Sequence, residues 1–217
     1  YHLVVFAPAS VQESIDLMSV AFDTADKYQC PVMIVADGMI CQMMEPVELP
    51  EMKEYKVDLE KKPWAANGHG FSKKSGRSII NSMYINTEDL TVHNENLQAT
   101  YREIEKNEVR FEAYNMENAE IVVTAFGTVA RIAKSAIDDL KEEGFNVGLF
   151  RPITLWPFPY KELHDAGMAP GVKAVLDVEL NAGQMLEDVK LAMNGETKVE
   201  LLSRLGDSVS TAFNTAG

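Results

Sequence analysis

The stretch that decides the fold is IVVTAFGTVARIAKSAIDDLKEEGFNVGLF, residues 121–150. It opens with the apolar run 121–126, which is typical of a strand buried on both faces. A helical pattern follows from Thr128 to Glu143 and ends at Gly144, and Val147–Phe150 is a second apolar run. Strand, helix and strand in this order predict a crossover between parallel strands.

Upstream of this stretch we expect a polar helix from Leu97 to Tyr114. Downstream of it the same alternation continues. Four further elements are predicted, in the order helix, strand, helix and strand: 160–166, 173–178, 184–193 and 199–202. Repeated alternation of this kind predicts an α/β fold with an open, mostly parallel sheet and helices on both faces.

A second strand–helix–strand unit lies at the beginning of the chain. The apolar runs 3–7 and 32–36 predict two buried strands. Between them Ser10 and Glu13 have the spacing of a capping box at the start of a helix, and Pro31 stops that helix. We therefore expect a partial α/β domain at residues 1–46.

The segment between the two units has no clean period. It contains Pro46, Pro50 and Pro63 and a glycine-rich polar tract. A structureless loop of this length is unusual inside one compact domain. We predict an irregular wrapping segment at 47–93 and a second α/β domain at 94–217.

Composition excludes several classes of protein. The 33 acidic side chains against 20 basic ones give a formal charge of −13, which repels phosphate backbones and argues against a nucleic-acid partner. The two cysteines, Cys30 and Cys41, are too few for an iron–sulfur cluster and match no CxxC pair, so we expect reduced thiols. No apolar run is long enough to cross a membrane and no signal peptide is visible, so we expect a cytoplasmic protein.

Polar residues at the carboxyl ends of the strands are candidates for ligand binding, because ligands of open parallel sheets meet these loops. Gly127 and Thr128 open a helix, whose free N–H groups would bind an anion; simple capping by Thr128 is the alternative. Arg151 would hold a carboxylate or phosphate, bridge to another subunit, or form a structural ion pair.

Two other loops are candidates for contacts with a partner. Trp156 and Phe158 lie between prolines, a pattern that predicts a rigid apolar protrusion at a protein interface. Asn181 and Gln184 flank Gly183 and would offer hydrogen bonds, although they also fit a plain helix start. The sequence has no GxGxxG, P-loop, HExxH or GxSxG motif, so the residues alone lead to an α/β subunit with a ligand or partner edge.

These loops carry a likeness to a known family. The chain resembles the α, pyrimidine-binding, subunit of thiamine-diphosphate-dependent 2-oxoacid:ferredoxin oxidoreductases, and most of all the 2-ketoisovalerate type. The segments with the strongest likeness are APASVQE at 7–13, ADGM at 36–39, QMMEPV at 42–47, RPITLWPFP at 151–159 and NAGQM at 181–185. The likeness covers most of the chain outside 51–94.

The resemblance implies that residues 1–46 are the back half of a pyrimidine-binding domain, and that 94–217 are similar to the carboxyl-terminal domain of transketolases. It implies oxidative decarboxylation of a 2-oxoacid to an acyl-coenzyme A, with electrons passed to ferredoxin. Asp37 and Gly38 would lie in the domain nearest the pyrimidine, and Gly127 and Thr128 would be cofactor-proximal. Arg151, Trp156, Phe158, Asn181 and Gln184 would contact partners.

The resemblance also implies that this chain lacks a complete catalytic set, because the glutamate that activates the cofactor would precede Tyr1. Thiamine diphosphate and Mg²⁺ would be held largely by the β subunit, and iron–sulfur clusters by γ or ferredoxin-like subunits. Two other readings remain open: a lipoate-linked 2-oxoacid dehydrogenase β subunit or other transketolase-like enzyme, and a non-enzymatic flavodoxin-like binding module.

Overall fold

The computed structural model describes residues 2–51, 62, 64–66 and 80–205. Their contacts divide the chain into two units: one formed by 1–48 with 101–217, and one formed by 49–100. Both sheets lie in the first unit, to which the description below is confined apart from the helix α2. Most of the predicted wrapping segment lies outside the described residues, and the predicted division at 46 and 94 stays a prediction.

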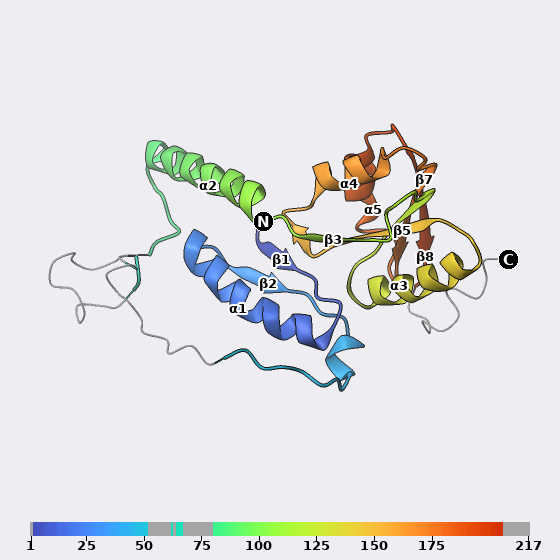
Figure 1. Cartoon of the computed structure of the whole chain (residues 1–217). Helices are drawn as coiled ribbons and strands as arrows, with labels where there is room; N and C mark the ends of the chain where they lie inside the picture. The colour runs from blue at the N-terminus through green and yellow to red at the C-terminus, as the bar shows by residue number, and fades with distance from the viewer. Residues whose placement is uncertain (1, 52–61, 63, 67–79, 206–217) are drawn as a thin grey trace. The chain divides into compact units, whose positions relative to one another are not determined.

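The elements follow one another along the chain as Figure 1 shows. They are β1 (Val4–Phe6), α1 (Val11–Tyr28), β2 (Val32–Ile34), the short 3-10 helix η1 (Ile40–Gln42), α2 (Thr87–Asn107), β3 (Phe111–Tyr114), β4 (Ile121–Thr124), α3 (Gly127–Glu142), β5 (Val147–Pro152), β6 (Thr154–Trp156), α4 (Tyr160–Gly167), β7 (Ala174–Glu179), α5 (Leu186–Met193) and β8 (Lys198–Ser203).

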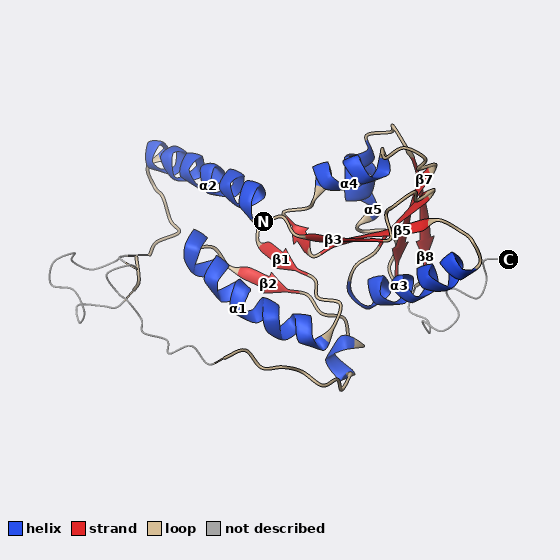
Figure 2. Ribbon diagram, viewed as in Figure 1, coloured by secondary structure: helices blue, strands red, loops and turns tan. Residues whose placement is uncertain are grey.

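The large sheet has five strands in the order β3-β5-β4-β7-β8. Its four central and carboxyl-terminal strands are parallel, and only the edge strand β3 runs antiparallel, against β5. One face packs on α3 through Ala130, Ala133 and Ile137, and the other packs on α4 and α5 through Leu163 and Val189 (Figure 2). The predicted α/β architecture with helices on both faces is confirmed.

The small sheet has three strands in the order β2-β1-β6. β1 and β2 are parallel, as predicted, and α1 packs on them through Leu17 and Ala21. The third strand, β6, was predicted to be loop; it pairs antiparallel with β1, and the Ala7 N–H donates to the Ile153 carbonyl at 2.8 Å. The chain therefore passes from the large sheet to the small one within a single residue after Pro152.

One predicted helix is wrong in its extent. Residues 97–114 were expected to be helical, but α2 begins at Thr87, inside the segment predicted to be irregular, and ends at Asn107, and Phe111–Tyr114 is β3. The register explains the difference, because Glu112 pairs opposite Arg151 and Tyr114 opposite Leu149. Backbone pairing with a strand far along the sequence overrides the helical preference of a polar segment.

The capping box at the start of α1 is present in a modified form. The Glu13 N–H donates to Ser10 Oγ at 3.1 Å, as predicted. The return bond comes one residue earlier than in the standard box, because Glu13 Oε2 accepts from the Ala9 N–H at 2.7 Å. This fixes the Glu13 carboxylate at the edge that faces the large sheet.

Candidate functional site

Asp37 and Thr128, two residues predicted to lie near a ligand, are hydrogen-bonded to each other. Asp37 follows β2, and its carboxylate accepts the Thr128 N–H at 2.9 Å and the Thr128 hydroxyl at 2.8 Å. The N–H groups of Met39 and Ile40 donate to the same carboxylate at 3.0 Å each. Burial alone would raise the pKa of Asp37, but these donors, the Thr128 hydroxyl first, hold it below its ordinary value. The carboxylate is thus an ionised cap on α3.

The Asp37 carboxylate occupies the position at Gly127 and Thr128 where the sequence predicted an anion-binding site. The helix N-terminus already faces a carboxylate, so a second anion such as a diphosphate would meet like charge there. Gly127 adopts a φ of +60°, and a β-carbon at this position would lie 3.0 Å from Asp37 Oδ2. The described residues around Thr128 therefore do not fit a diphosphate, whereas they do join the two sheets.

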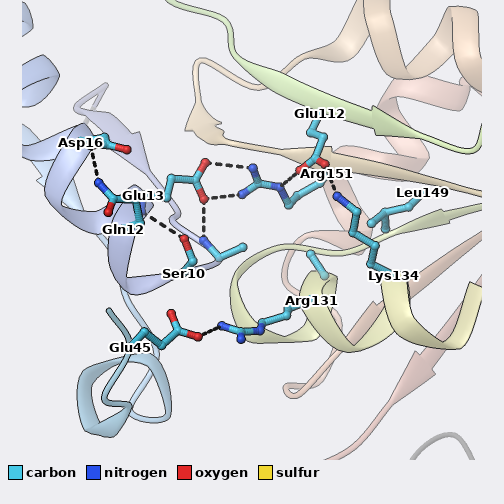
Figure 3. A pocket seen from close by; sticks show the side chains of 12 residues that line it. Ser10, Gln12, Glu13, Asp16, Glu45, Glu112, Arg131, Lys134, Leu149 and Arg151 are labelled. Carbon is cyan, nitrogen blue, oxygen red and sulfur yellow. Dashed lines mark hydrogen bonds and ion pairs between the residues drawn. The ribbon is translucent and has the colours of Figure 1, made fainter. Parts of the chain in front are cut away.

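Arg151 is the centre of a second connection between the sheets. Its guanidinium donates to both carboxylate oxygens of Glu13, at 2.8 and 2.9 Å, and through Nε to Glu112 at 2.9 Å (Figure 3). Only 7% of the side chain is exposed. Burial would lower the pKa of Arg151, but the two carboxylates raise it above its ordinary value. Of the alternatives left open by the sequence, the structural ion pair is the one observed.

Glu112 extends this network to α3. Its other oxygen accepts from Lys134 Nζ at 2.6 Å. Burial would raise the pKa of Glu112, but Lys134 and Arg151 lower it. The cluster Glu13, Arg151, Glu112 and Lys134, here called the ion-pair network, therefore consists of alternating charges from α1, β5, β3 and α3.

A third connection involves the segment after η1. Glu45 forms an ion pair with Arg131 of α3 at 2.5 Å and accepts the Val11 N–H at 3.3 Å. The side-chain amide of Gln12 binds the backbone of the same segment. It accepts from the Glu48 N–H and donates to the Glu48 carbonyl. The Arg131 bond lowers the pKa of Glu45.

These connections surround a cavity of about 510 Å³ (Figure 3). Ala9, Ala130 and Leu149 provide apolar lining, and the remaining walls are largely the charged residues just described. Arg131, Lys134 and Arg151 each already contact a carboxylate. The charged groups that line the cavity are therefore already paired with one another across the two sheets.

The loop after β7 is organised by Glu179, which is 2% exposed. Its carboxylate accepts from the N–H groups of Met185 and Leu186, at 3.1 and 3.0 Å, and from Asn181 Nδ2 at 2.7 Å. Asn181 Oδ1 in turn accepts from the N–H groups of Gly183 and Gln184. Asn181 thus shapes the start of α5, the plainer of the two readings, while the Gln184 side chain is exposed.

The predicted apolar protrusion is wrong for Phe158. This side chain is 5% exposed and belongs to the core of the large sheet, with Phe150, Leu163 and Val175. Trp156 is half-buried beside His2, at 5.0 Å between ring centroids. The proline-flanked pattern predicts exposure, but β6 turns this segment inward to pair with β1.

The described contacts bring Asp37 together with Thr128, but none of them joins this pair to Asn181 or Gln184. Sequence reasoning missed Glu112 and Lys134 as members of the ion-pair network, and also Asp177, a buried carboxyl on β7. An acidic residue inside the apolar run 174–178 was the available signal for Asp177, because carboxylates are rarely buried without a partner.

The described residues contain neither a candidate metal-ion site nor a candidate membrane-spanning helix. No group of three or more His, Cys, Asp or Glu side chains is placed to hold a metal ion in this part of the chain. Within the same residues, no helix has both the length and the apolar character needed to cross a membrane. The described cysteines, Cys30 and Cys41, are both free.

Comparison with protein families gives two matches that together cover most of the chain. Residues 1–113 match the model described as pyruvate flavodoxin/ferredoxin oxidoreductase, thiamine diphosphate-binding. Residues 119–214 match the model described as pyruvate:ferredoxin oxidoreductase core domain II. The boundary between the matches falls between β3 and β4.

Individual relatives agree with these matches. The chain is 42% identical over 210 residues to the ketoisovalerate oxidoreductase subunit VorB of Methanothermobacter marburgensis, which covers 96% of this chain and 57% of that protein. It is 29% identical over 225 residues to the 2-oxoglutarate synthase subunit KorA of Methanocaldococcus jannaschii, with coverage of 95% and 60%. The chain therefore spans a little over half the length of these curated relatives.

A solved structure has a similar fold. It is the 2-oxoglutarate:ferredoxin oxidoreductase from Magnetococcus marinus with 2-oxoglutarate, coenzyme A and succinyl-CoA bound. The match has a TM-score of 0.70 at 17% identity and covers 97% of this chain and 41% of that one. At this identity the likeness concerns the fold.

Proposed function

Because this chain belongs to the pyruvate flavodoxin/ferredoxin oxidoreductase family, with the thiamine diphosphate-binding model matching residues 1–113, we propose that it is part of the α subunit of a 2-oxoacid:ferredoxin oxidoreductase. The family membership confirms the resemblance drawn from the sequence. The proposed reaction is oxidative decarboxylation of a 2-oxoacid to an acyl-coenzyme A, with two electrons passed to ferredoxin.

The proposed substrate is a branched-chain 2-oxoacid, ketoisovalerate. The single observation that supports this choice is the 42% identity to a ketoisovalerate oxidoreductase subunit over 96% of the chain. Identity to the 2-oxoglutarate synthase subunit is 29% over a similar span. The higher identity favours the branched-chain acid as the proposed substrate.

Thiamine diphosphate is the proposed cofactor and would supply the carbanion chemistry of the decarboxylation. The capped N-terminus of α3 does not fit the diphosphate, so we assign the diphosphate and Mg²⁺ to a partner β subunit. Coenzyme A would be a co-substrate, and iron–sulfur clusters would lie on γ and ferredoxin-like subunits. The complex would be cytoplasmic.

For the residues of this chain, we propose supporting roles. Asp37, Gly38, Gly127 and Thr128 would form the cofactor-proximal seam, with the Asp37 carboxylate committed to Thr128 rather than to a ligand. Trp156 is half-buried. It remains, with Asn181 and Gln184, a proposed position near a subunit contact.

The test is reconstitution of the full-length α subunit with its partner subunits, thiamine diphosphate and Mg²⁺. We expect coenzyme A-dependent reduction of ferredoxin or of a viologen dye when ketoisovalerate is added, and weaker reduction with 2-oxoglutarate or pyruvate. A complex that ignores every 2-oxoacid offered would refute the proposal. Transfer of the acyl group to a lipoyl domain without dye reduction would point to a lipoate-linked dehydrogenase, and a bound flavin to a binding module.

A further inference from the structure

Two carboxyl groups lie next to each other in the core of the large sheet. Asp177 and Glu179 are on the same face of β7, because side chains two apart along a strand point the same way. Asp177 is 0% exposed and Glu179 is 2% exposed. Charged groups are rarely buried so completely without a cation beside them, and among the described residues neither carboxyl forms an ion pair with a Lys or Arg.

Glu179 has the donors that an ionised carboxylate needs. Three N–H groups point at it, from the backbone of Met185 and Leu186 and from the Asn181 side chain, at 2.7 to 3.1 Å. Two of them belong to the N-terminal end of α5, where the helix dipole also favours negative charge. The Glu179 carboxylate is therefore well placed to remain charged.

Asp177 has no comparable set of donors. Its Oδ1 accepts from the Thr124 hydroxyl at 2.8 Å. Its Oδ2 is the one buried side-chain polar atom without a hydrogen-bond partner among the residues that the structure describes. The side chain that interacts with the Asp177 carboxyl is Glu179, which is itself an acceptor. Two carboxyl groups attract each other through a hydrogen bond only when one of them carries a proton, because an ionised carboxylate is an acceptor only.

We propose that Asp177 is a neutral carboxylic acid that donates its proton from Oδ2 to Glu179, and that this shared proton holds the turn 179–186 in place. The proton satisfies the otherwise unpaired Oδ2 and removes the repulsion between two buried carboxylates. It leaves both Glu179 oxygens able to accept from α5 and Asn181. Asp177 is thus a positioning residue for this turn, and the inference does not depend on the proposed function.

Within the part of the chain that the structure describes, the elements packed around Asp177 place no cation in an ion pair with it. β4 presents Thr124, and β8 places Leu201 beside Asp177 in the register. The other charges on these elements are the exposed pair Lys198 and Glu200 on β8, the acidic first turn of α5, and Lys190, which is exposed in the last turn of α5. Arg204 follows β8 and donates its backbone N–H to the Glu179 carbonyl.

The chemistry of the pair agrees with this assignment. Burial first, and then the Glu179 carboxyl, raise the pKa of Asp177 to about 8. A carboxyl whose pKa is raised on folding contributes stability that is fully present below its unfolded pKa of about 4 and is lost as pH rises through the folded pKa. We therefore expect the turn 179–186 to loosen as the pH passes about 8, because the pair then carries two negative charges.

Infrared spectroscopy of the full chain tests the assignment directly. The carbonyl band of a neutral carboxylic acid should be present at pH 7, should disappear as the pH is raised past about 8, and should be absent from Asp177→Asn. The matched control is Glu187→Gln, which removes an exposed carboxylate from the adjoining helix and should leave the band unchanged. A wild-type protein with no such band at pH 7, or a band that persists in Asp177→Asn, would overturn the proposal.

Two further measurements separate a proton site from a merely structural role. Asn mimics the neutral acid, so Asp177→Asn should retain the fold and should lose much of the fall in unfolding temperature that the wild type shows between pH 5 and about pH 9. Should this variant fail to fold, Glu179→Gln serves instead. Removing its negative charge should lower the pH at which the Asp177 band disappears, and an unchanged or higher value would contradict the shared proton.

Discussion

Two helices of the first unit are capped at their N-termini by a carboxylate. The two carboxylates differ in how far along the sequence they lie from the helix that they cap. α5 is capped by Glu179, six residues before Met185 on the strand that leads into the helix. α3 is capped by Asp37, which lies 91 residues before Thr128 and follows a strand of the other sheet. The first cap is part of one strand–turn–helix connection. The second ties the small sheet to the large one, so the same chemistry serves local structure in one place and assembly of the unit in the other.

The two regions also differ in the direction in which the pKa of their aspartate is shifted. Asp37 receives four donor bonds and its pKa is lowered. Asp177, beside Glu179, receives one from Thr124 and its pKa is raised to about 8. Donors decide the outcome, because each carboxylate is at least partly buried and burial alone would raise the pKa of both. The seam between the sheets is therefore built from ionised groups, and the end of β7 from a shared proton.

The largest effect on stability is expected at the local cap. Glu179→Ala removes the acceptor of two backbone N–H groups and of the Asn181 amide in a site that is 2% exposed. Leaving such donors unpaired costs about 1–3 kcal/mol each, so for these three donors we expect a loss of about 3 kcal/mol or more. Urea unfolding measures it, with the exposed Glu187→Ala as control. A loss below about 1 kcal/mol would mean that the cap contributes little.

The next effect is expected at the ion-pair network. Arg151→Met leaves Glu13 and Glu112 without their shared cation at a position where the arginine is 7% exposed. Breaking a buried pair costs about 3–5 kcal/mol, and the partial exposure of the two carboxylates places this case near about 3 kcal/mol. Arg131→Met, which breaks the more exposed pair with Glu45, is the matched control and should cost clearly less. Equal losses would remove the distinction between the two pairs.

A smaller effect is expected at the cap between the sheets. Asp37→Ala should cost about 1–2 kcal/mol, the usual value for an N-cap. Because the folded pKa of Asp37 is lowered, its ionic contribution is present above the unfolded pKa of about 4 and is lost as pH falls through the folded pKa. The difference in stability between the wild type and Asp37→Asn should therefore shrink in acid. A difference that grows on acidification would show that Asp37 is not ionised.

An effect similar in size to that at Asp37 is expected at Gly127. Its φ of +60° costs a non-glycine residue about 1–2 kcal/mol, and the β-carbon would press on Asp37 Oδ2. Gly127→Ala should lower the unfolding temperature, whereas Gly38→Ala, where nothing lies within 4 Å of the new β-carbon, should be close to neutral. Combining Gly127→Ala with Asp37→Ala should relieve part of the strain. A fully additive double variant would argue against contact between the two positions.

The strands and helices of this chain could be predicted where the pattern is local. Apolar runs marked β4, β5 and β7, and Ser10 with Glu13 marked the start of α1. Short strands could not be predicted where the sequence shows no apolar run or alternating pattern. Phe111–Tyr114 is a strand because β5 lies beside it, and Thr154–Trp156 because β1 does.

The candidate site shows the same limit more sharply. The sequence placed Asp37 and Thr128 at the carboxyl ends of strands, but their mutual contact depends on how two sheets meet. Glu13 and Arg151 are 138 residues apart, a separation at which no spacing rule operates. Phe158 was expected at the surface and lies in the core, because the pairing of β6 with β1 decides which way the segment turns.

The measurement that tests the central claim most directly is the fate of the carboxyl group of labelled ketoisovalerate. In the reconstituted complex with ferredoxin and coenzyme A, we predict release of carbon dioxide from carbon 1, formation of the branched acyl-coenzyme A, and transfer of two electrons to ferredoxin for each molecule released. Omission of either coenzyme A or thiamine diphosphate should stop the turnover. Ferredoxin that remains oxidised with ketoisovalerate and with every other 2-oxoacid offered would contradict the assignment.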